Sequence, residues 1–271
     1  MFECVLNVSE GRRQDVIDAL SLAAGPSLRD QHSDASHNRS VFTLIDSPDE
    51  LRRNTHAFIA ATMKRLDLRE HEGVHPRFGV LDVVPFVALD RRQSLEAVVL
   101  RDETAMFVAN TFDVPVFLYG KLADGTTRTL PEVRRSAFRT LMPDRGPLEP
   151  NPQRGASAIG ARAILVAWNL WLHGVSLGEA NDIVKAIRRR EVRALAFQIG
   201  DFVQISCNLV EPFVVGPSRV YDQVASLLRS GEIDHAELVG LLPQKVLEKE
   251  DPARWEQLGL SEQKTIETRL A

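Results

Sequence analysis

The order in which strand-like and helix-like segments alternate constrains the fold of this chain more than any other feature of its sequence. Segments with the two-residue period of a strand and the 3.6-residue period of a helix follow each other as strand, helix, strand, strand, helix, strand. A further helix and strand end the first half, and the same order returns in the second half. Two βαββαβ units predict an α+β fold of two subdomains related by duplication, each an antiparallel sheet with helices packed on one face.

The same patterns predict the bounds of the elements. Strands are expected at 2–8, around Leu28, and at 41–45, 80–89, 114–119, 163–170, 194–197, 203–209 and 235–242. Helices are expected between Gly11 and Gly25, from Pro48 to Leu66 behind a capping box that begins at Ser47, at 94–110, 176–189 and 217–229, and once or twice after Lys249. The residues between Gln31 and Asn38 are expected to form a polar loop.

A proline-rich segment separates the two halves. Five prolines lie between residues 127 and 154, which predicts an extended crossing segment rather than a helix or a strand. We therefore expect two subdomains, at 1–150 and 151–271.

Composition excludes several classes of protein. The chain has 271 residues, of which 44% are hydrophobic, and this suffices for a substantial core. Its net charge of −4, without a basic run, argues against nucleic-acid and membrane partners. No apolar stretch is long enough for a membrane span, and no signal sequence is apparent. The two cysteines, Cys4 and Cys207, lie in apolar strand-like runs and are expected to be buried, reduced thiols, so a cytoplasmic location is predicted.

Residues 71–75 read His-Glu-Gly-Val-His, which matches the pattern of zinc hydrolases. In that pattern both histidines bind the metal from one face of a helix. Gly73 and Pro76 oppose a helix here, because glycine costs about 1 kcal/mol and proline about 3 kcal/mol relative to alanine. We expect an irregular loop that binds no metal.

Residues 174–178 match the G-x-S-x-G motif of serine hydrolases. Ser176 is followed three residues later by Glu179, which is the pattern of a helix capping box. We therefore expect Ser176 to cap a helix rather than to act as a nucleophile.

Two polar turns and the loop around His75 are candidates for ligand binding. The turn that contains Asn7, Ser9, Glu10 and Arg12 could bind an anionic or polar ligand, although Ser9 could equally be a helix cap. The pair at 38–39 could bind a ligand or could be a solvated loop tip.

In the loop, Gly73 and Gly79 allow tight turns, Pro76 fixes a dihedral angle, and Arg77 offers a planar fork for a carboxylate. His75 can exchange a proton near neutral pH. The alternative is a loop histidine that is hydrogen-bonded to backbone.

At this point the sequence resembles the formiminotransferase domain of glutamate formimidoyltransferase. The most specific matching block is His71-x-Gly73-x-His75-Pro76-Arg77-x-Gly79-x-x-Asp82-Val83-x-Pro85-Phe86. Further matches follow in order through most of the chain: Glu3-Cys4-Val5, residues 7–12, residues 38–43, residues 115–120, Gly160-Ala161-Arg162, Ser206-x-Asn208-Leu209 and residues 238–243.

This resemblance implies two subdomains of related ferredoxin-like topology, a substrate tunnel between them and a homodimer. It also implies transfer of a formimino group from N-formiminoglutamate to N5 of tetrahydrofolate, a step of histidine degradation. His75 would be the general base, tetrahydrofolate the acceptor substrate, and no metal would be needed because the amidinium is already a charged electrophile. The implied substrate- and folate-binding residues are Asn7, Ser9, Glu10, Arg12, Asn38, Arg39, Arg77, Gly79, Asp82, Ser206 and Asn208.

The sequence departs from the family pattern at three places. His32 stands where the family has the second acid of an Asp-x-Asp pair, the segment from Arg188 to Gln198 is short and lacks glycine, and residues 143–147 lie in a shortened linker. No cyclodeaminase domain is expected. These departures keep two alternatives open: a close relative that uses a different donor, and a catalytically silent paralogue that binds folate or another carboxylate ligand.

Overall fold

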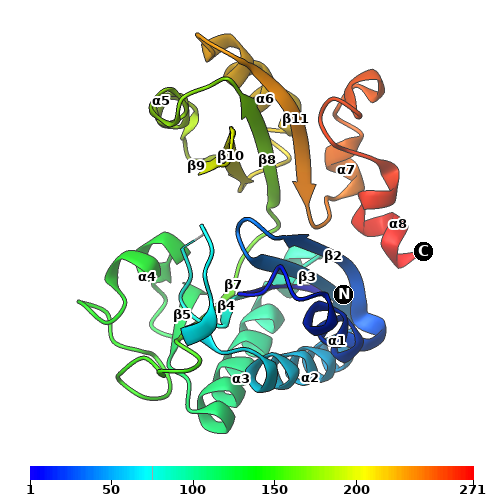
Figure 1. Cartoon of the computed structure of the whole chain (residues 1–271). Coiled ribbons are helices and arrows are strands. Elements are labelled where there is room, and N and C mark those ends of the chain that lie inside the picture. Colours follow the sequence, from blue (N-terminus) through cyan, green and yellow to red (C-terminus); the bar gives the residue numbers. More distant parts are fainter. Residues whose placement is uncertain (75) are drawn as a thin grey trace. The chain divides into compact units, whose positions relative to one another are not determined.

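A computed structural model describes residues 1–74 and 76–271 of the chain (Figure 1). The chain divides into two compact units, Met1–Ala163 and Ile164–Ala271. Each unit has its own sheet and its own hydrophobic core.

The first unit is built on a seven-stranded mixed sheet with the strand order β2-β3-β1-β4-β7-β5-β6. β1 pairs antiparallel with β3 and β4, whereas β7 pairs parallel with both β4 and β5. The strands are β1 (Phe2–Val8), β2 (Leu28–Asp34), β3 (Arg39–Asp46), β4 (Leu81–Ala88), β5 (Val116–Lys121), β6 (Thr127–Arg128) and β7 (Ser157–Ala161).

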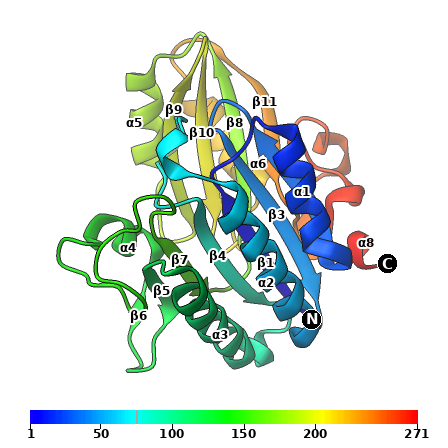
Figure 2. The same ribbon diagram turned by 60° about the horizontal axis from the view of Figure 1, so that its bottom comes forward.

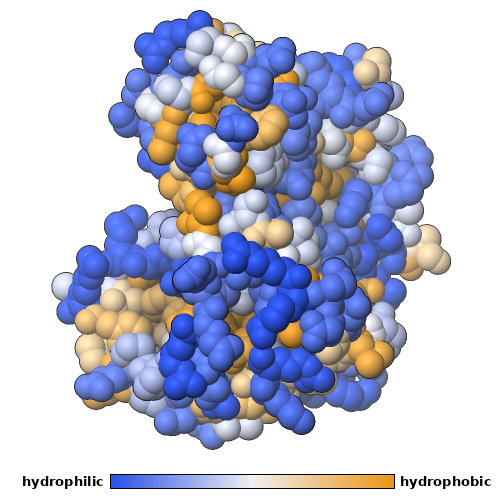
Figure 3. Space-filling model, in the orientation of Figure 1, coloured by the Kyte–Doolittle hydropathy of each residue, from blue (hydrophilic) through white to orange (hydrophobic). Residues whose placement is uncertain are grey.

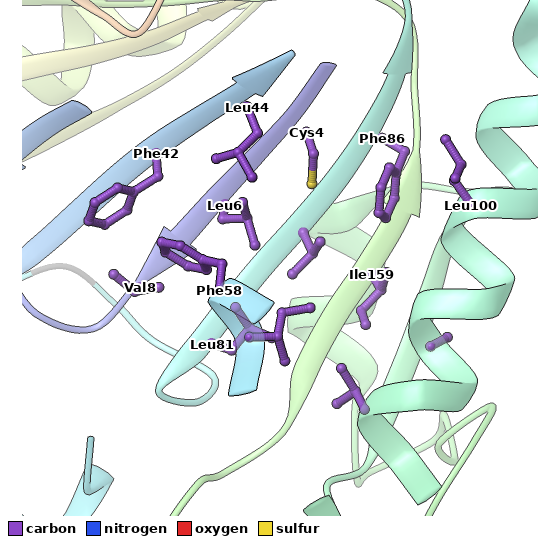
Figure 4. Packing of buried hydrophobic residues seen from close by; sticks show 14 of the residues in the cluster. Cys4, Leu6, Val8, Phe42, Leu44, Phe58, Leu81, Phe86, Leu100 and Ile159 are labelled. Carbon is purple, nitrogen blue, oxygen red and sulfur yellow. The ribbon is translucent and has the colours of Figure 1, made fainter. Parts of the chain in front are cut away.

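Three helices cover one face of this sheet (Figure 2). They are α1 (Gln14–Ala24), α2 (Pro48–Arg65) and α3 (Ser94–Phe112). The alternate β1 side chains of Phe2, Cys4, Leu6 and Val8 are fully buried in the core below them, as period-two alternation requires. Figure 4 shows Phe58 and Leu100 packed with residues of β1, β3, β4 and β7 in this core.

A smaller apolar cluster lies at the β5 end of the sheet, on a short helix, α4 (Leu130–Ser136). Val133 of α4 packs there with Val83 and Phe117. The helix begins with a complete capping box between Thr129 and Glu132. The prediction of an extended segment is therefore wrong for the residues of α4. Pro131 occupies the first turn of this helix, where proline is compatible with a helix.

The second unit contains a four-stranded antiparallel sheet with the order β11-β8-β10-β9. Its elements are β8 (Val166–His173), α5 (Leu177–Ile187), β9 (Val192–Ile199), β10 (Phe202–Leu209), α6 (Pro217–Leu227) and β11 (Glu232–Val239), followed by α7 (Gln244–Leu247) and α8 (Ile266–Leu270). Trp168 is fully buried in its core and donates from Nε1 to the Leu258 carbonyl at 2.8 Å. Hydrophilic and apolar residues are interspersed over the face of each unit seen in Figure 3.

Four expectations are corrected by these elements. The first sheet is mixed rather than purely antiparallel, because β7 lies between β4 and β5. The boundary expected at 150 precedes β7, whose pairing places residues 157–161 in the first unit. Residues 31–34 are not loop but the end of β2, an edge strand that can carry polar side chains. Ser47 begins α2 without a side-chain cap.

Glu3 is a buried carboxyl group in the middle of the first sheet. Its neighbours Phe2 and Cys4 point into the helix-covered core, so Glu3 faces the opposite side, where it is only 4% exposed. Burial raises the pKa of Glu3 from its ordinary 4.5 to about 7, against the opposing charge of Arg162.

We expect this group to make stability fall as the pH rises. Because its pKa is raised on folding, its contribution is complete below about pH 4.5 and is lost as the pH passes about 7. Urea unfolding of Glu3→Gln should show a flatter fall in unfolding free energy between pH 4.5 and 7 than the native chain, by roughly 1–3 kcal/mol. The exposed Glu232→Gln is the control. An unchanged slope in Glu3→Gln would contradict the assignment.

Candidate active site

Three segments of the first unit meet around a small hollow. They are the β1–α1 connection at 9–13, the β2–β3 turn at 34–39, and the described residues 71–74 and 76–79, which precede β4. The hollow is partly open to solvent and is lined by Ser9, His37, Asn38, Arg39, His71, Arg77 and Asp82. Five of the sequence-predicted site residues are thus brought together, namely Ser9, Asn38, Arg39, Arg77 and Asp82.

Glycines allow these segments to approach each other at backbone distance. A Cβ atom on Gly11 would lie 2.3 Å from the Asp34 carbonyl oxygen, and one on Gly73 would lie 2.3 Å from that of His37. On Gly79 it would lie 2.2 Å from the Ala156 carbonyl oxygen. Gly79 therefore has a structural role here, because no side chain fits at this position.

Asn38 joins all three segments. It has a left-handed conformation with φ of 47°, which asparagine tolerates better than most residues. Its Oδ1 accepts from the Gly11 amide at 2.9 Å, and its Nδ2 donates to the Glu72 carbonyl at 2.8 Å. Its own carbonyl accepts from Nε2 of His71 at 2.7 Å. The alternative of a solvated loop tip at 38–39 is therefore wrong, since Asn38 is buried and its side chain and carbonyl are hydrogen-bonded within the protein.

The charged side chains of the hollow are held in fixed positions. Arg77 donates from Nη2 to the His71 carbonyl at 2.5 Å and from Nη1 to the Gly73 carbonyl at 3.3 Å. Arg39 donates from Nη2 to Oδ1 of Asn7, which places Asn7 next to the hollow. Burial lowers the pKa of Arg39 while the charge of Asp82 raises it, and a guanidinium remains charged throughout the physiological range.

Asp82 is a buried acceptor between two donors. It is 1% exposed, and its Oδ1 accepts from the Phe78 amide at 2.7 Å. Its Oδ2 accepts from Nη2 of Arg134 on α4 at 2.5 Å. With both oxygens bonded inside the protein, Asp82 orients its neighbours and balances one of the arginine charges.

The N-terminal turn uses its polar side chains within the protein. Ser9 donates from Oγ to the Gly79 carbonyl at 2.8 Å, so it does not cap α1, and that alternative is wrong. Glu10 accepts from the amides of Arg12 and Arg13, both at 2.9 Å. Burial alone would raise the pKa of Glu10, but these bonds and the Arg13 guanidinium outweigh it and lower the pKa. Arg12 donates from Nε to the Ala35 carbonyl at 2.8 Å and fixes the neighbouring turn.

Three residues of this region escaped the sequence analysis as site residues. His71 and His37 line the hollow, and Arg134 binds Asp82. His71 could have been found, because it begins the most specific matching block. Arg134 lies 52 residues from Asp82 in sequence, and no local pattern connects the two.

His75 lies outside the described residues, so its assignment as general base stays a prediction. The described neighbours at 71–74 and 76–79 belong to no helix, as expected from Gly73 and Pro76. Within residues 1–74 and 76–271, no group of three or more metal-binding side chains is present.

Ser206 and Asn208 belong to the second unit. Both lie on β10, where Ser206 is opposite Asn169 of β8 and Leu195 of β9, and Asn208 is exposed. Their role in binding stays a prediction. His32, on β2, is opposite Val41 of β3.

The remaining catalytic motifs have structural roles. Ser176 accepts from the Glu179 amide at 3.2 Å and caps α5, as predicted. Cys4 and Cys207 are free and buried, and burial raises the pKa of the Cys207 thiol to about 12. A thiol with so high a pKa is a poor nucleophile at neutral pH. None of the helices in the described part of the chain combines the length and apolar character that a membrane crossing requires.

The chain is similar to known proteins over most of its length. Residues 1–162, nearly the whole first unit, match the model of the formiminotransferase domain, N-terminal subdomain. A glutamate formimidoyltransferase of Streptococcus pyogenes is 32% identical over 90% of this chain and 90% of its own length. One of Thermoplasma acidophilum is 33% identical over 91% of this chain and 89% of its own length. A formimidoyltransferase-cyclodeaminase of Rattus norvegicus is 31% identical over 91% of this chain, which spans 51% of that relative.

The fold, the site and these relatives together define a transferase of one-carbon groups. The chain belongs to the formiminotransferase family.

Proposed function

We propose that this protein transfers the formimino group of N-formiminoglutamate to N5 of tetrahydrofolate, as a step of histidine degradation. One observation carries the proposal: residues 9–13, 34–39, 71–74 and 76–79 converge on a hollow lined by Arg39 and Arg77, in a chain related to formimidoyltransferases over about nine-tenths of its length. Both substrates carry carboxylates, which guanidinium groups bind in bidentate geometry.

In the proposed mechanism, N5 of tetrahydrofolate attacks the amidinium carbon and a tetrahedral intermediate forms. His75 takes the proton from the attacking nitrogen and returns it to the leaving amine, and glutamate departs. The donor is held by Arg39, Arg77 and the turn that contains Asn38. This places its amidinium carbon opposite the acceptor nitrogen. Asn7 positions Arg39 through its Oδ1. Glu10, Arg12 and Gly79 shape the site, and Ser206 and Asn208 are proposed folate contacts.

The direct test is an assay of the native chain with both substrates. We expect formation of 5-formiminotetrahydrofolate, followed by absorbance, to depend on both substrates. Product formation without N-formiminoglutamate would contradict the proposed donor. No turnover, together with measurable binding of tetrahydrofolate by calorimetry, would instead support the silent paralogue, which His32 and the short segment from Arg188 to Gln198 keep open.

The architecture supports a further proposal about origin. If the first four strands of each unit are numbered along the chain, the first unit has the order 2-3-1-4, and the second unit has the same order when read from its β9 edge. We infer that both are ferredoxin-like units related by duplication. A homodimer and a cytoplasmic location remain part of the proposal, and light scattering of the purified chain would test the dimer.

A further inference from the structure

His71 lines the hollow with a ring whose two nitrogens have different surroundings. Nε2 lies 2.7 Å from the Asn38 carbonyl oxygen, which can only accept, so Nε2 carries a hydrogen. In the neutral ring, Nδ1 then carries the lone pair. Nδ1 is buried, and no described residue forms a hydrogen bond with it.

The surroundings of the ring favour this neutral form. A second proton on Nδ1 would create a buried donor that has no acceptor among the described residues. Burial lowers the pKa of His71, the Asn38 carbonyl opposes this, the charge of Arg77 lowers it further and Glu10 raises it. The net effect is a lowered pKa, and the ring is a neutral Nε2–H donor at neutral pH.

The bond to Asn38 reaches beyond the two residues that form it. The backbone of Asn38 is in the left-handed region, and its side chain bonds to Gly11 and to Glu72. The next residue is Arg39, which lines the hollow. Fixing the Asn38 carbonyl therefore fixes the start of β3 and the direction in which Arg39 leaves it.

We propose that His71 is a positioning residue whose Nε2–H group holds the Asn38 turn in the conformation that presents Arg39 to a carboxylate of the donor. The identity of that donor, N-formiminoglutamate, rests on the proposed function. His71 acts through Asn38 and does not exchange a proton with the substrate.

Two substitutions distinguish the effect of the hydrogen bond from the effect of the imidazole ring. His71→Gln places an amide nitrogen close to where Nε2 lies and keeps the donor, whereas His71→Leu fills similar space without one. His71→Leu should raise KM for N-formiminoglutamate about fivefold to tenfold and leave kcat within about twofold, because the bond acts on binding. His71→Gln should remain within about twofold of the native chain in both constants.

A second measurement, amide hydrogen exchange, reports the stability of the turn and needs no substrate. The Gly11 amide donates to Asn38 Oδ1, so its hydrogen exchange reports whether the turn is held. Exchange at Gly11 should be about fivefold faster in His71→Leu and unchanged in His71→Gln. His56→Leu is the matched control, since His56 is another partly buried histidine, which stacks on Phe107 in the helical layer.

The outcomes distinguish this inference from the proposed function. Absence of turnover in the native chain would refute the proposed function, and the Gly11 exchange would still decide the role of His71. Unchanged exchange and unchanged KM in His71→Leu would overturn the positioning role. An equal loss of kcat in His71→Gln and His71→Leu would overturn it as well, because it would assign the chemistry to the ring.

Discussion

A His75→Ala variant is expected to lose formimidoyl transfer by about 10²–10⁴-fold in kcat, which is the usual contribution of a positioned general acid–base group. The expectation rests on the sequence around position 75 and on the proposed mechanism, in which a single imidazole takes a proton from N5 and returns it to the departing amine. Unfolding by urea should be nearly unchanged. The measurement is single-turnover kinetics with both substrates at saturation, since this isolates the chemical step from binding and release.

His56→Ala provides the control for His75→Ala. It removes a histidine of the same unit that stacks on Phe107 at 4.0 Å between ring centroids, in the helical layer. Its kcat should equal that of the native chain. A His75→Ala variant that keeps more than about a tenth of the native kcat would refute the assignment of His75 as general base.

A Gly73→Ala variant is expected to disrupt the site although it adds only one methyl group. The new Cβ would lie 2.3 Å from the His37 carbonyl oxygen and 3.1 Å from Cβ of Asn38, so the backbone of one segment must move. Overpacking of this kind costs about 1–3 kcal/mol of unfolding free energy. Displacing the reacting groups by about 1 Å can lower catalysis about 10²-fold. Urea unfolding and kcat/KM measure the two effects.

Gly178→Ala is the matched glycine control. The nearest atom to its Cβ would be Oγ of Ser176, at 3.8 Å, which is ordinary contact distance. Because Gly178 lies in α5, alanine should stabilise the helix by up to about 1 kcal/mol. Full activity and full stability in Gly73→Ala would show that the 71–79 segment can shift without consequence, and would contradict the close packing described above.

The fold was predictable where local patterns decide it. β1 has the bounds that its alternating apolar residues predict, and α6 starts at Pro217 as expected. β7 was missed because the apolar run from Ser157 to His173 contains two strands in two different sheets, and periodicity cannot show where the pairing partner changes. α4 was missed because Pro131 belongs to a series of five prolines between residues 127 and 154, and such a series is typical of extended chain.

The site was predictable in its parts but not in its connections. Asn38, Arg39 and Arg77 were expected as ligand contacts, yet the bonds that Asn38 makes to Gly11, Glu72 and His71 join residues up to 34 positions apart. Such bonds depend on the approach of three backbones, which Gly11 and Gly73 permit but no local pattern specifies. Ser9 was ambiguous for the same reason, because its acceptor, Gly79, lies 70 positions away.

The hydrogen bond between Trp168 and Leu258 has a consequence for the ends of this polypeptide. Trp168 lies on β8, the first strand of the second unit, and its indole N–H donates to the Leu258 carbonyl in the C-terminal tail. A parallel bridge between Leu242 and Thr265 is a second contact of that tail. Removing the tail would leave a buried donor unpaired and open the interior of the sheet on that side. The segment that follows β11 is therefore part of the packed structure of the second unit.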